Sequence, residues 1–418
     1  MNFWLTTSLL DECRNWITKA LAELNGTGDD ECEMVLRSGL GLALLFTEGM
    51  TPATHTNLTR ALSIAEAIGN NEHQKRVVHA FWQISLRSVE LHRALQLSRR
   101  YAEFAHSDTD STATHTANLM VGMSLTYLAE YDEASTLLEQ AIHDYPVAQR
   151  QHEIAWLGID APSSAFGHLS TCLFARGLID AAIWTAERSI EEARQVGQAV
   201  VLCLALTRPA GLLFPEVGAF DTAERYIAEI MEQADRHGLD TFRALAVCAK
   251  GRMLFMRGDL ASGAAALRSG VAHLEATGYR SLHTIFRSYF AEALTAVGDT
   301  DEGLAEIEAA VRFAEQTDYM RFVPELLCIH GRLIALRQPD DPAAEQIFLR
   351  AIALARQQQA LYWELRAGLS LAERWQTRGR RREAYTLLAP IYQRFTEGFA
   401  TPILTRANAL LQATESGE

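Results

Sequence analysis

Residues 173–182 read LFARGLIDAA, and related phrases recur along the chain. They read LFPEVGAFDTA at 213–223, LFMRGDLASG at 254–263, LTAVGDTDEG at 294–303 and WQTRGRRREA at 375–384. Each phrase places a glycine between two apolar segments, at Gly177, Gly218, Gly258, Gly298 and Gly379. The first three steps are 41, 40 and 40 residues, and the last gap of 81 leaves room for one more turn near Gln338. A fixed period of this length is typical of a helical repeat protein.

The same period continues toward the N-terminus. Steps of 40, 40 and 41 residues connect Ala129, Val89, Gly49 and Ser8. The step from Ala129 to Gly177 is 48 residues, which predicts an insertion at 146–152. We therefore expect a single solenoid over 1–418 with about ten helical hairpins. Its expected divisions are repeats 1–4 in 1–145, repeats 5–10 in 153–398, and a capping helix and tail in 399–418.

Small side chains keep the same register as the turns. Five residues after each turn stand Cys13, Thr54, Ala94, Ala134, Ala182, Ala223, Gly263, Gly303, Ala343 and Ala384. Seven residues before the later turns stand Gly122, Ser170, Gly211, Gly251, Ala291, Gly331 and Ala372. Antiparallel helices need small side chains where their backbones cross closely. Apolar residues spaced by three and four around them predict helices, so the fold class is all-α. Gly211, Gly251 and Gly331 are expected at crossings too tight for larger side chains.

This register resembles the tetratricopeptide (TPR) repeat, in which two small residues and a turn glycine have these relative positions. The resemblance implies a right-handed superhelix. The period departs from that family, whose repeats have about 34 residues. The longer repeat, with phrases such as FWLTTSLLDECRNWITKAL and EGFATPILTRANALL, is similar to the C-terminal sensor region of large bacterial ATP-dependent regulators, including LuxR-type activators. There a winged-helix or cyclase domain and a signalling ATPase precede the repeats, which implies that ATPase and DNA-binding domains belong to the same native chain.

Composition limits the partners and the location. Lys and Arg number 38 against 52 Asp and Glu, a net charge of −14, which argues against nucleic-acid contact and against an anionic membrane surface. No uninterrupted apolar run approaches the ~18 residues of a membrane span. The first residues lack the basic start of a signal peptide. The six cysteines are scattered without a CxxC pair, so we expect reduced thiols in the cytoplasm.

Catalytic and cofactor motifs are missing from the sequence. It contains no GxxxxGK[ST] phosphate loop and no GxSxG nucleophile turn. His152 and Glu153 begin an HExxH pattern, but Trp156 stands where the second histidine belongs. The 13 histidines do not cluster at metal-ligand spacing. We therefore expect no enzyme activity, no cofactor and no metal.

The TPR resemblance also implies which helix A residues line the concave groove. In that family they stand 13, 10, 6 and 3 residues before the turn. These offsets give a candidate binding set in repeats 6 to 10: Arg208, Arg252, Phe255, Glu292, Arg332, Arg366 and Glu373. Guanidinium groups can bind carboxylate or phosphate in a forked geometry, so the expected partner is a protein, a peptide or a small anionic metabolite. The alternative is that Glu292, Glu325 and Glu373 neutralise the arginines internally.

Pro209 stands in the middle of a segment expected to be helical, beside Arg208. A proline there removes one hydrogen bond and clashes with the carbonyl of Ala205, so a kink is expected. Freed carbonyl groups beside an inward arginine would form a polar pocket. The alternative is a kink that only adjusts the pitch of the superhelix.

Three classes of function come into question. The first is the sensor or interaction region of a bacterial signalling ATPase-type transcriptional regulator, and the second is a free-standing TPR peptide receptor or scaffold. The third, an enzyme, has no motif in its favour. The first repeat would reach its turn near Ser8 without most of its first helix, so the chain is expected to be a piece of a longer protein. A complete protein with a degenerate first hairpin is the alternative.

Overall fold

The computed structural model describes residues 10–24, 29–49, 51–106 and 111–415, and in these ranges every regular element is a helix. The N-terminal part comprises α2 (Leu10–Leu24), α3 (Asp30–Thr47), α4 (Pro52–Ala67), α5 (Asn71–Ser88), α6 (Leu91–His106), α7 (Ser111–Leu128) and α8 (Tyr131–Ile142). The middle part comprises η1 (Val147–Gln149), α9 (Arg150–Leu157), α10 (Ala161–Ala175), α11 (Ile179–Val196), α12 (Ala199–Arg208), η2 (Pro209–Leu213), α13 (Phe214–Glu216), α14 (Phe220–His237), α15 (Asp240–Met256) and α16 (Leu260–Ala276). The C-terminal part comprises α17 (Arg280–Ala296), α18 (Thr300–Gln316), η3 (Met320–Phe322), α19 (Val323–Arg337), α20 (Pro342–Gln357), α21 (Leu361–Thr377), α22 (Arg381–Tyr392) and α23 (Pro402–Glu415).

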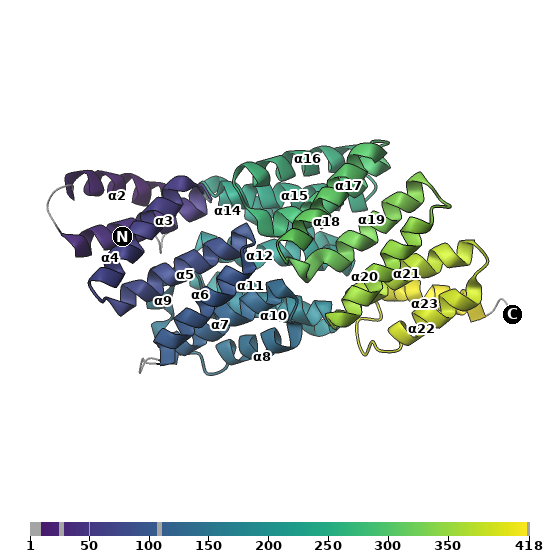
Figure 1. Ribbon diagram of the computed structural model, residues 1–418, viewed down its shortest axis with the longest axis horizontal. Coiled ribbons are helices and arrows are strands. Elements are labelled where there is room, and N and C mark those ends of the chain that lie inside the picture. The colour runs from purple at the N-terminus through teal and green to yellow at the C-terminus, as the bar shows by residue number, and fades with distance from the viewer. Residues whose placement is uncertain (1–9, 25–28, 50, 107–110, 416–418) are drawn as a thin grey trace.

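Consecutive helices form antiparallel hairpins that stack along the molecule, from the purple N-terminal helices to the yellow C-terminal helices (Figure 1). The all-α solenoid expected from the sequence is confirmed. The predicted turn residues in the described part adopt the left-handed conformation that ends a helix, with φ from 64° to 103°: Gly49, Val89, Ala129, Gly177, Gly218, Gly258, Gly298 and Gly379. Gln338 differs, with φ −138°, because a residue that precedes a proline is held in extended geometry. Ser8 lies outside the described residues, so the number of repeats stays a prediction.

The turns between hairpins are a second regular series that the sequence reasoning did not use. Residues with left-handed φ follow the second helix of most hairpins: Gly69, Asp144, Gly197, Gly238, Gly278, Asp318, Gln359 and Gly398. Five of these eight are glycine, because that residue adopts positive φ without steric cost.

The predicted close crossings are real, but one has a different neighbour. A Cβ on Gly251 would lie 2.8 Å from the backbone nitrogen of Leu267 and 3.0 Å from the Gly263 carbonyl. A Cβ on Gly331 would lie 2.9 Å from the Phe348 ring on the partner helix. Gly211 instead faces Phe286 of α17, at 3.1 Å, and not its own hairpin partner α14.

Pro209 explains the different orientation of Gly211. Helix α12 ends at Arg208 and is followed by five residues of π-helix, in which hydrogen bonds span five residues instead of four. Because the proline lacks an N–H, this wider turn replaces the regular helix and rotates the next residues about the helix axis. The expected disruption at Pro209 is therefore confirmed, as a π-turn. The carbonyl of Gly211 accepts a hydrogen bond at 2.8 Å from Nη1 of Arg252, not from the neighbouring Arg208.

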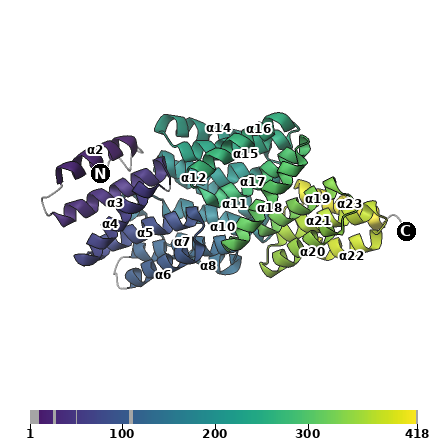
Figure 2. The same cartoon turned by 45° about the horizontal axis from the view of Figure 1, so that its top comes forward.

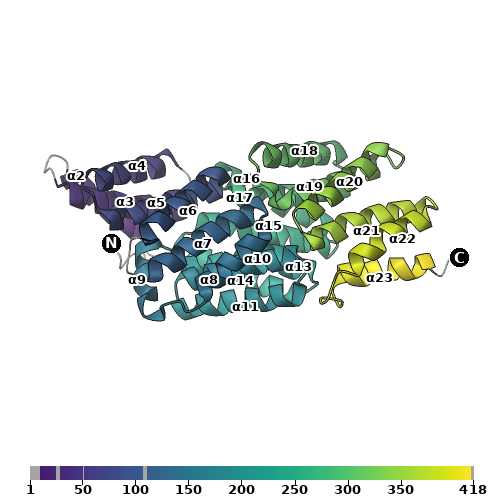
Figure 3. The same ribbon diagram turned by 60° about the horizontal axis from the view of Figure 1, so that its bottom comes forward.

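The superhelix closes on itself, so hairpins far apart in sequence touch. Helix α17 packs on α5, η3 on α7, and α21 on α10. Figures 1, 2 and 3 agree that the green helices α17 to α19 lie alongside the blue helices α5 to α8. At one contact the amide of Ala181 donates to Glu397 at 3.0 Å, and the amide of Gly398 donates to Asp180 at 3.1 Å. The interior consequently lies between two superhelical turns.

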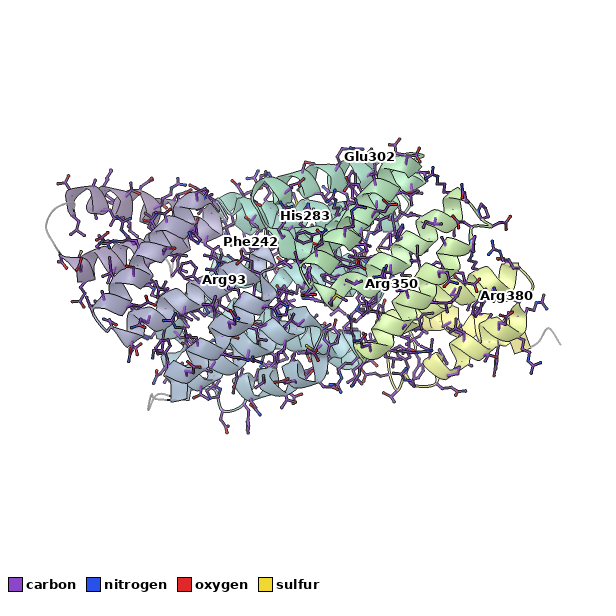
Figure 4. The ribbon with its side chains drawn as sticks, in the orientation of Figure 1. Arg93, Phe242, His283, Glu302, Arg350 and Arg380 are labelled. Atoms are coloured by element: carbon purple, nitrogen blue, oxygen red, sulfur yellow. The ribbon has the colours of Figure 1, made fainter. Side chains whose placement is uncertain are left out.

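Ion pairs connect successive hairpins on the outer surface. Arg268 contacts Glu302 at 2.7 and 3.0 Å, and Arg380 contacts Glu345 at 2.8 Å. Arg350 pairs with Glu315 in the same way, and Figure 4 shows Glu302, Arg350 and Arg380 over the outer helices. Exposed pairs of this kind contribute about 0–1 kcal/mol each. Many of the arginines therefore have a structural partner one repeat away.

The predicted insertion contains helical structure. Residues 147–149 form the short helix η1, and α9 comes next and packs on α5. Arg150 at its start lies 2.6 Å from Asp160 and 2.7 Å from Glu192, so this segment is tied to α11. The window Ala199–Glu216 is long and apolar enough to cross a membrane, although Thr207 and Arg208 interrupt its apolar sequence. Seventy-eight per cent of it is buried within the protein, as in a core helix.

Candidate ligand-binding chamber

Two adjoining cavities lie inside the superhelix, and we call them together the chamber. Gly167 and Arg208 line both cavities. The first cavity is also lined by Tyr131, Ser170, Thr171, Phe174, Ala175, Pro209, Leu212, Leu213, Glu216, Tyr289, Arg321, Phe322 and Trp363. The second is also lined by Trp82, Gln83, Leu86, Arg87, Met123, Tyr127, Ile159, Ser163, Ser164, His168, Ser189, Leu204, Ala205 and Tyr279. Residues from both superhelical turns therefore enclose one space.

The predicted groove residues Arg252 and Arg366 lie beside the first cavity and are neutralised. Both guanidinium groups pair with Glu216, which also accepts a hydrogen bond from the Tyr362 hydroxyl at 2.6 Å. Nε of Arg366 also lies 2.8 Å from a carboxylate oxygen of Glu325. Burial favours the neutral form of Glu216, but Arg366 and Arg252 outweigh it and lower its pKa to about 2. This side of the chamber thus holds a network of two guanidinium groups and two carboxyl groups.

The remaining predicted residues also have partners. Arg332 contacts Glu292 at 2.5 Å, and Glu373 contacts Arg406 at 2.5 and 2.6 Å. Phe255 is half-buried and packs against the core. Internal pairing, the alternative to ligand binding, describes Arg332 with Glu292 and Arg366 with Glu325. Whether any of the predicted set binds a ligand stays a prediction.

Arg208 differs from the other predicted arginines because no described carboxylate pairs with it. Its Nη2 donates to the hydroxyl of Tyr127 at 2.8 Å, and its buried Nε has no hydrogen-bond partner among the described residues. Burial lowers the pKa of Arg208, but Tyr127 and Tyr279 outweigh this effect and hold it above its usual value. The side chain therefore stays charged at the junction of the two cavities.

Arg321 is a lining residue that the sequence reasoning missed. It lies on η3, between two hairpins, and is 2% exposed. Its Nε and Nη1 are buried without a hydrogen-bond partner in the described part of the chain. The guanidinium lies over the Phe322 ring at 4.6 Å and the Tyr127 ring at 5.4 Å. The groove offsets apply only to helix A, so they could not identify a residue in a turn between hairpins.

The two unneutralised arginines alter the groups around them. Burial raises the pKa of Tyr127, but Arg208 and Arg321 outweigh burial and leave it below the usual value. Burial, Arg208 and Arg321 together hold the pKa of His168 well below its usual value, so this histidine is neutral. Burial is the larger cause for His168, and the two positive charges act in the same direction on the pKa of both groups. The centre of the chamber therefore favours a negative charge.

The second cavity is also lined by cationic and hydrogen-bond-donating groups. Arg87 contributes another guanidinium, which contacts Gln83 at 3.4 Å, and burial lowers the pKa of Arg87. The hydroxyl groups of Ser163, Ser164 and Ser189 are also at its wall, and none of its described lining residues is acidic. Serine hydroxyls and guanidinium groups supply hydrogen-bond donors. No group of three or more His, Cys, Asp or Glu side chains that could hold a metal occurs among the residues described.

Comparison with known proteins gives structural relatives only. No protein-family model matches the chain, and no curated protein matches its sequence. A Rap protein complexed with Competence and Sporulation Factor is similar in structure, with a TM-score of 0.58, 12% identity, and coverage of 91% of this chain and 99% of that one. A Rap conjugation gene regulator of plasmid pLS20 with the Phr* peptide gives 0.46 at 11% identity, covering 82% and 96%. A STAND protein with a tetratricopeptide repeat sensor from Pyrococcus horikoshii gives 0.43 at 13% identity, covering 91% of this chain and 55% of that one. The chain thus has the fold of a TPR-like helical solenoid.

Proposed function

We propose that this chain is a non-catalytic binding solenoid that holds a protein segment, a peptide or a small anionic metabolite in its chamber. The observation that carries the proposal is the space at Arg208 and Arg321, two guanidinium groups without a carboxylate partner among the residues that the structure describes. Ligand sites are typically concave, with apolar walls and a few convergent polar groups. The chamber has apolar walls and convergent guanidinium groups.

The enclosure limits the size of the partner. Contacts such as those of Asp180 with Gly398 and of Glu397 with Ala181 join the superhelical turns around the chamber. A folded domain is larger than the space that the lining residues of these joined turns surround. A short extended segment or a small molecule is therefore the form of ligand that we propose.

The proposed biological setting is the first of the hypotheses drawn from the sequence. We propose a cytoplasmic sensor region of a bacterial signalling regulator, with a free-standing receptor or scaffold as the alternative. The similar Rap structure holds Competence and Sporulation Factor, which supports a signal-binding role for a solenoid of this shape. A closed superhelix also suits a sensor, because a ligand that contacts both turns changes their relative stability.

A chamber-filling variant tests the proposal. Thr171 lines the first cavity, so Thr171→Trp fills it, whereas the matched control Thr136→Trp adds the same side chain at an exposed position of α8. The purified proteins are screened against a phage-displayed random peptide library and a set of carboxylate and phosphate metabolites. We expect ligands that bind the parent and the control but not Thr171→Trp. If every ligand of the parent is retained by a folded Thr171→Trp variant, the chamber is not the site.

A further inference from the structure

The guanidinium groups around the first cavity divide into two kinds. Arg252 and Arg366 pair with Glu216, and Tyr362 completes the hydrogen bonds of that carboxylate. Arg208 and Arg321 line the same cavity and have no carboxylate among the described residues. The chamber therefore has cationic groups in excess of the anions that its own walls supply.

The excess is costly to the protein alone. A buried cation loses its hydration, and the cost is recovered only by an anion with good hydrogen-bond geometry. For Arg321 the aromatic faces of Tyr127 and Phe322 compensate in part, since a cation is attracted to the face of a ring. Those rings accept no hydrogen bond from Nε and Nη1, for which the described part of the chain supplies no acceptor. The missing component is an acceptor with negative charge.

The apolar walls of the first cavity indicate the chemistry of the rest of the ligand. Phe174, Leu212 and Trp363 line the first cavity together with Phe322. Phe174 is itself packed on Tyr362, with ring centroids 4.0 Å apart, so this wall is fixed in place. A fully charged or strongly hydrated ligand would gain nothing from such a surface. An apolar body with one anionic end matches both parts of the cavity.

We propose that the first cavity binds a carboxylate attached to an apolar body, with the carboxylate on Arg208 and Arg321 and the body against Phe174, Leu212 and Trp363. This inference rests on the proposed function and specifies its ligand chemistry. Guanidinium and carboxylate form the strongest class of hydrogen bond available here, and they would repeat the arrangement that Glu216 already makes with Arg252 and Arg366. The carboxylate can belong to a free organic acid or to the C-terminus of a peptide.

Matched pairs of probes test this chemistry by isothermal titration calorimetry. The first pair is hydrocinnamate and its neutral amide, and the second is the tripeptide Ala-Leu-Phe with a free or an amidated C-terminus. Each pair keeps its shape and changes only the charge. We expect the acid of at least one pair to bind about tenfold or more tightly than its amide, since losing a charged hydrogen bond has that effect. The pair that discriminates identifies the source of the carboxylate.

Two arginine variants locate the effect. Arg321→Met and Arg208→Met should each weaken binding of the acid about tenfold or more and leave binding of the amide unchanged. Arg76→Met is the matched control, because Arg76 is also buried, has no hydrogen-bond partner within the described ranges and lies 4.4 Å over the Trp156 ring, yet it lines neither cavity. This control should bind the acid like the parent. A second readout separates function from folding: without ligand, Arg321→Met should melt at the same temperature as the parent or higher.

The outcomes that overturn the inference are distinct from those that overturn the proposed function. Equal binding of acid and amide, with both abolished by Thr171→Trp, would keep the chamber as the site and refute the carboxylate. Binding of neither acid would also refute it. Acid binding that survives Thr171→Trp would remove the chamber itself as the site. Lower stability of Arg321→Met with unchanged acid binding would make Arg321 a structural residue.

Discussion

Tyr127 and Tyr319 stack with their ring centroids 5.8 Å apart and their planes at 21°, although one belongs to α7 and the other precedes η3 in the following superhelical turn. The Tyr127 hydroxyl accepts a hydrogen bond from Arg208, and the face of the same ring is covered by Arg321. The Tyr319 hydroxyl donates to the carbonyl of Ser281 at 2.6 Å. This pair of rings therefore joins the two turns at the place where the cationic groups of the chamber meet.

Tyr127→Phe should destabilise the protein. The substitution keeps the ring stack and removes the acceptor of Arg208, whose charged donor would then be buried without a partner. Loss of such a partner costs about 1–3 kcal/mol. Urea denaturation measures the free energy of unfolding, and Tyr101→Phe serves as a buried-tyrosine control outside the chamber. A Tyr127→Phe variant with the stability of the parent would mean that the hydrogen bond to Arg208 contributes nothing.

Glu216→Gln should be among the most damaging substitutions in the chain. It leaves Arg252 and Arg366 buried without their shared carboxylate, and breaking a buried ion pair in this way costs about 3–5 kcal/mol. The folded pKa of Glu216, about 2, is below the usual 4.5. Its contribution to stability is therefore present above about pH 4.5 and is lost as pH falls toward 2.

The pH dependence gives the check on Glu216. Between pH 7 and pH 3 the parent should lose the stability that the Glu216 carboxylate contributes. Glu216→Gln lacks this contribution at every pH, so the difference in stability between the two proteins should narrow on acidification. Thermal melts at several pH values measure this difference. A difference that stays constant down to pH 3 would contradict the assigned pairing.

Glu325 should have the opposite pH dependence. Its burial raises the pKa to about 7, although Arg366 and Arg332 act to lower it. A carboxyl group with a raised folded pKa stabilises the folded state fully below about pH 4.5 and loses that contribution as pH rises through 7. Relative to the parent, Glu325→Gln should therefore gain roughly 3 kcal/mol between pH 4.5 and pH 8, because each pKa unit corresponds to about 1.4 kcal/mol. Parallel denaturation curves at pH 5 and pH 8 test the sign. A relative loss over this interval would refute it.

Gly251→Leu should cost about 1–3 kcal/mol or more. The Cβ alone would meet the backbone of α16 at 2.8 and 3.0 Å, and backbone atoms cannot move aside as a flexible side chain does. Ala265→Leu, on the exposed face of α16, is the control for the added side chain. If Gly251→Leu melts like the control, the close crossing of α15 and α16 is not as described.

Much of the local structure could be predicted from the sequence because its signals are local. Gly177 and the equivalent turn residues adopt positive φ, and Gly251 lies close to Gly263. Both features select small residues or glycine, which therefore recur at a fixed spacing along the sequence. Ion pairs between neighbouring repeats could also be predicted, such as that of Arg332 with Glu292, which are 40 positions apart.

The chamber could not be predicted in the same way. It depends on the small rotations between hairpins, which accumulate until the superhelix closes. Glu216 and Arg366 meet across 150 positions, and no local pattern records that contact. Arg321 lies on η3 between two hairpins, so its position at the chamber depends on the same accumulated rotations. Pro209 indicated a disturbed helix, but not that Arg252 would donate to the carbonyl of Gly211, which stands four residues before Pro215.

The most direct test of whether one ligand is held between the two superhelical turns is hydrogen–deuterium exchange with and without the ligand. The ligand is hydrocinnamate or the free-acid tripeptide, whichever binds. Our account predicts slower exchange in two regions that are distant in sequence, α10 with η2 on one turn and η3 with the start of α19 on the other. The outer helices α16 and α18 should be unchanged. Protection confined to one superhelical turn, or located on the outer helices, would contradict the account.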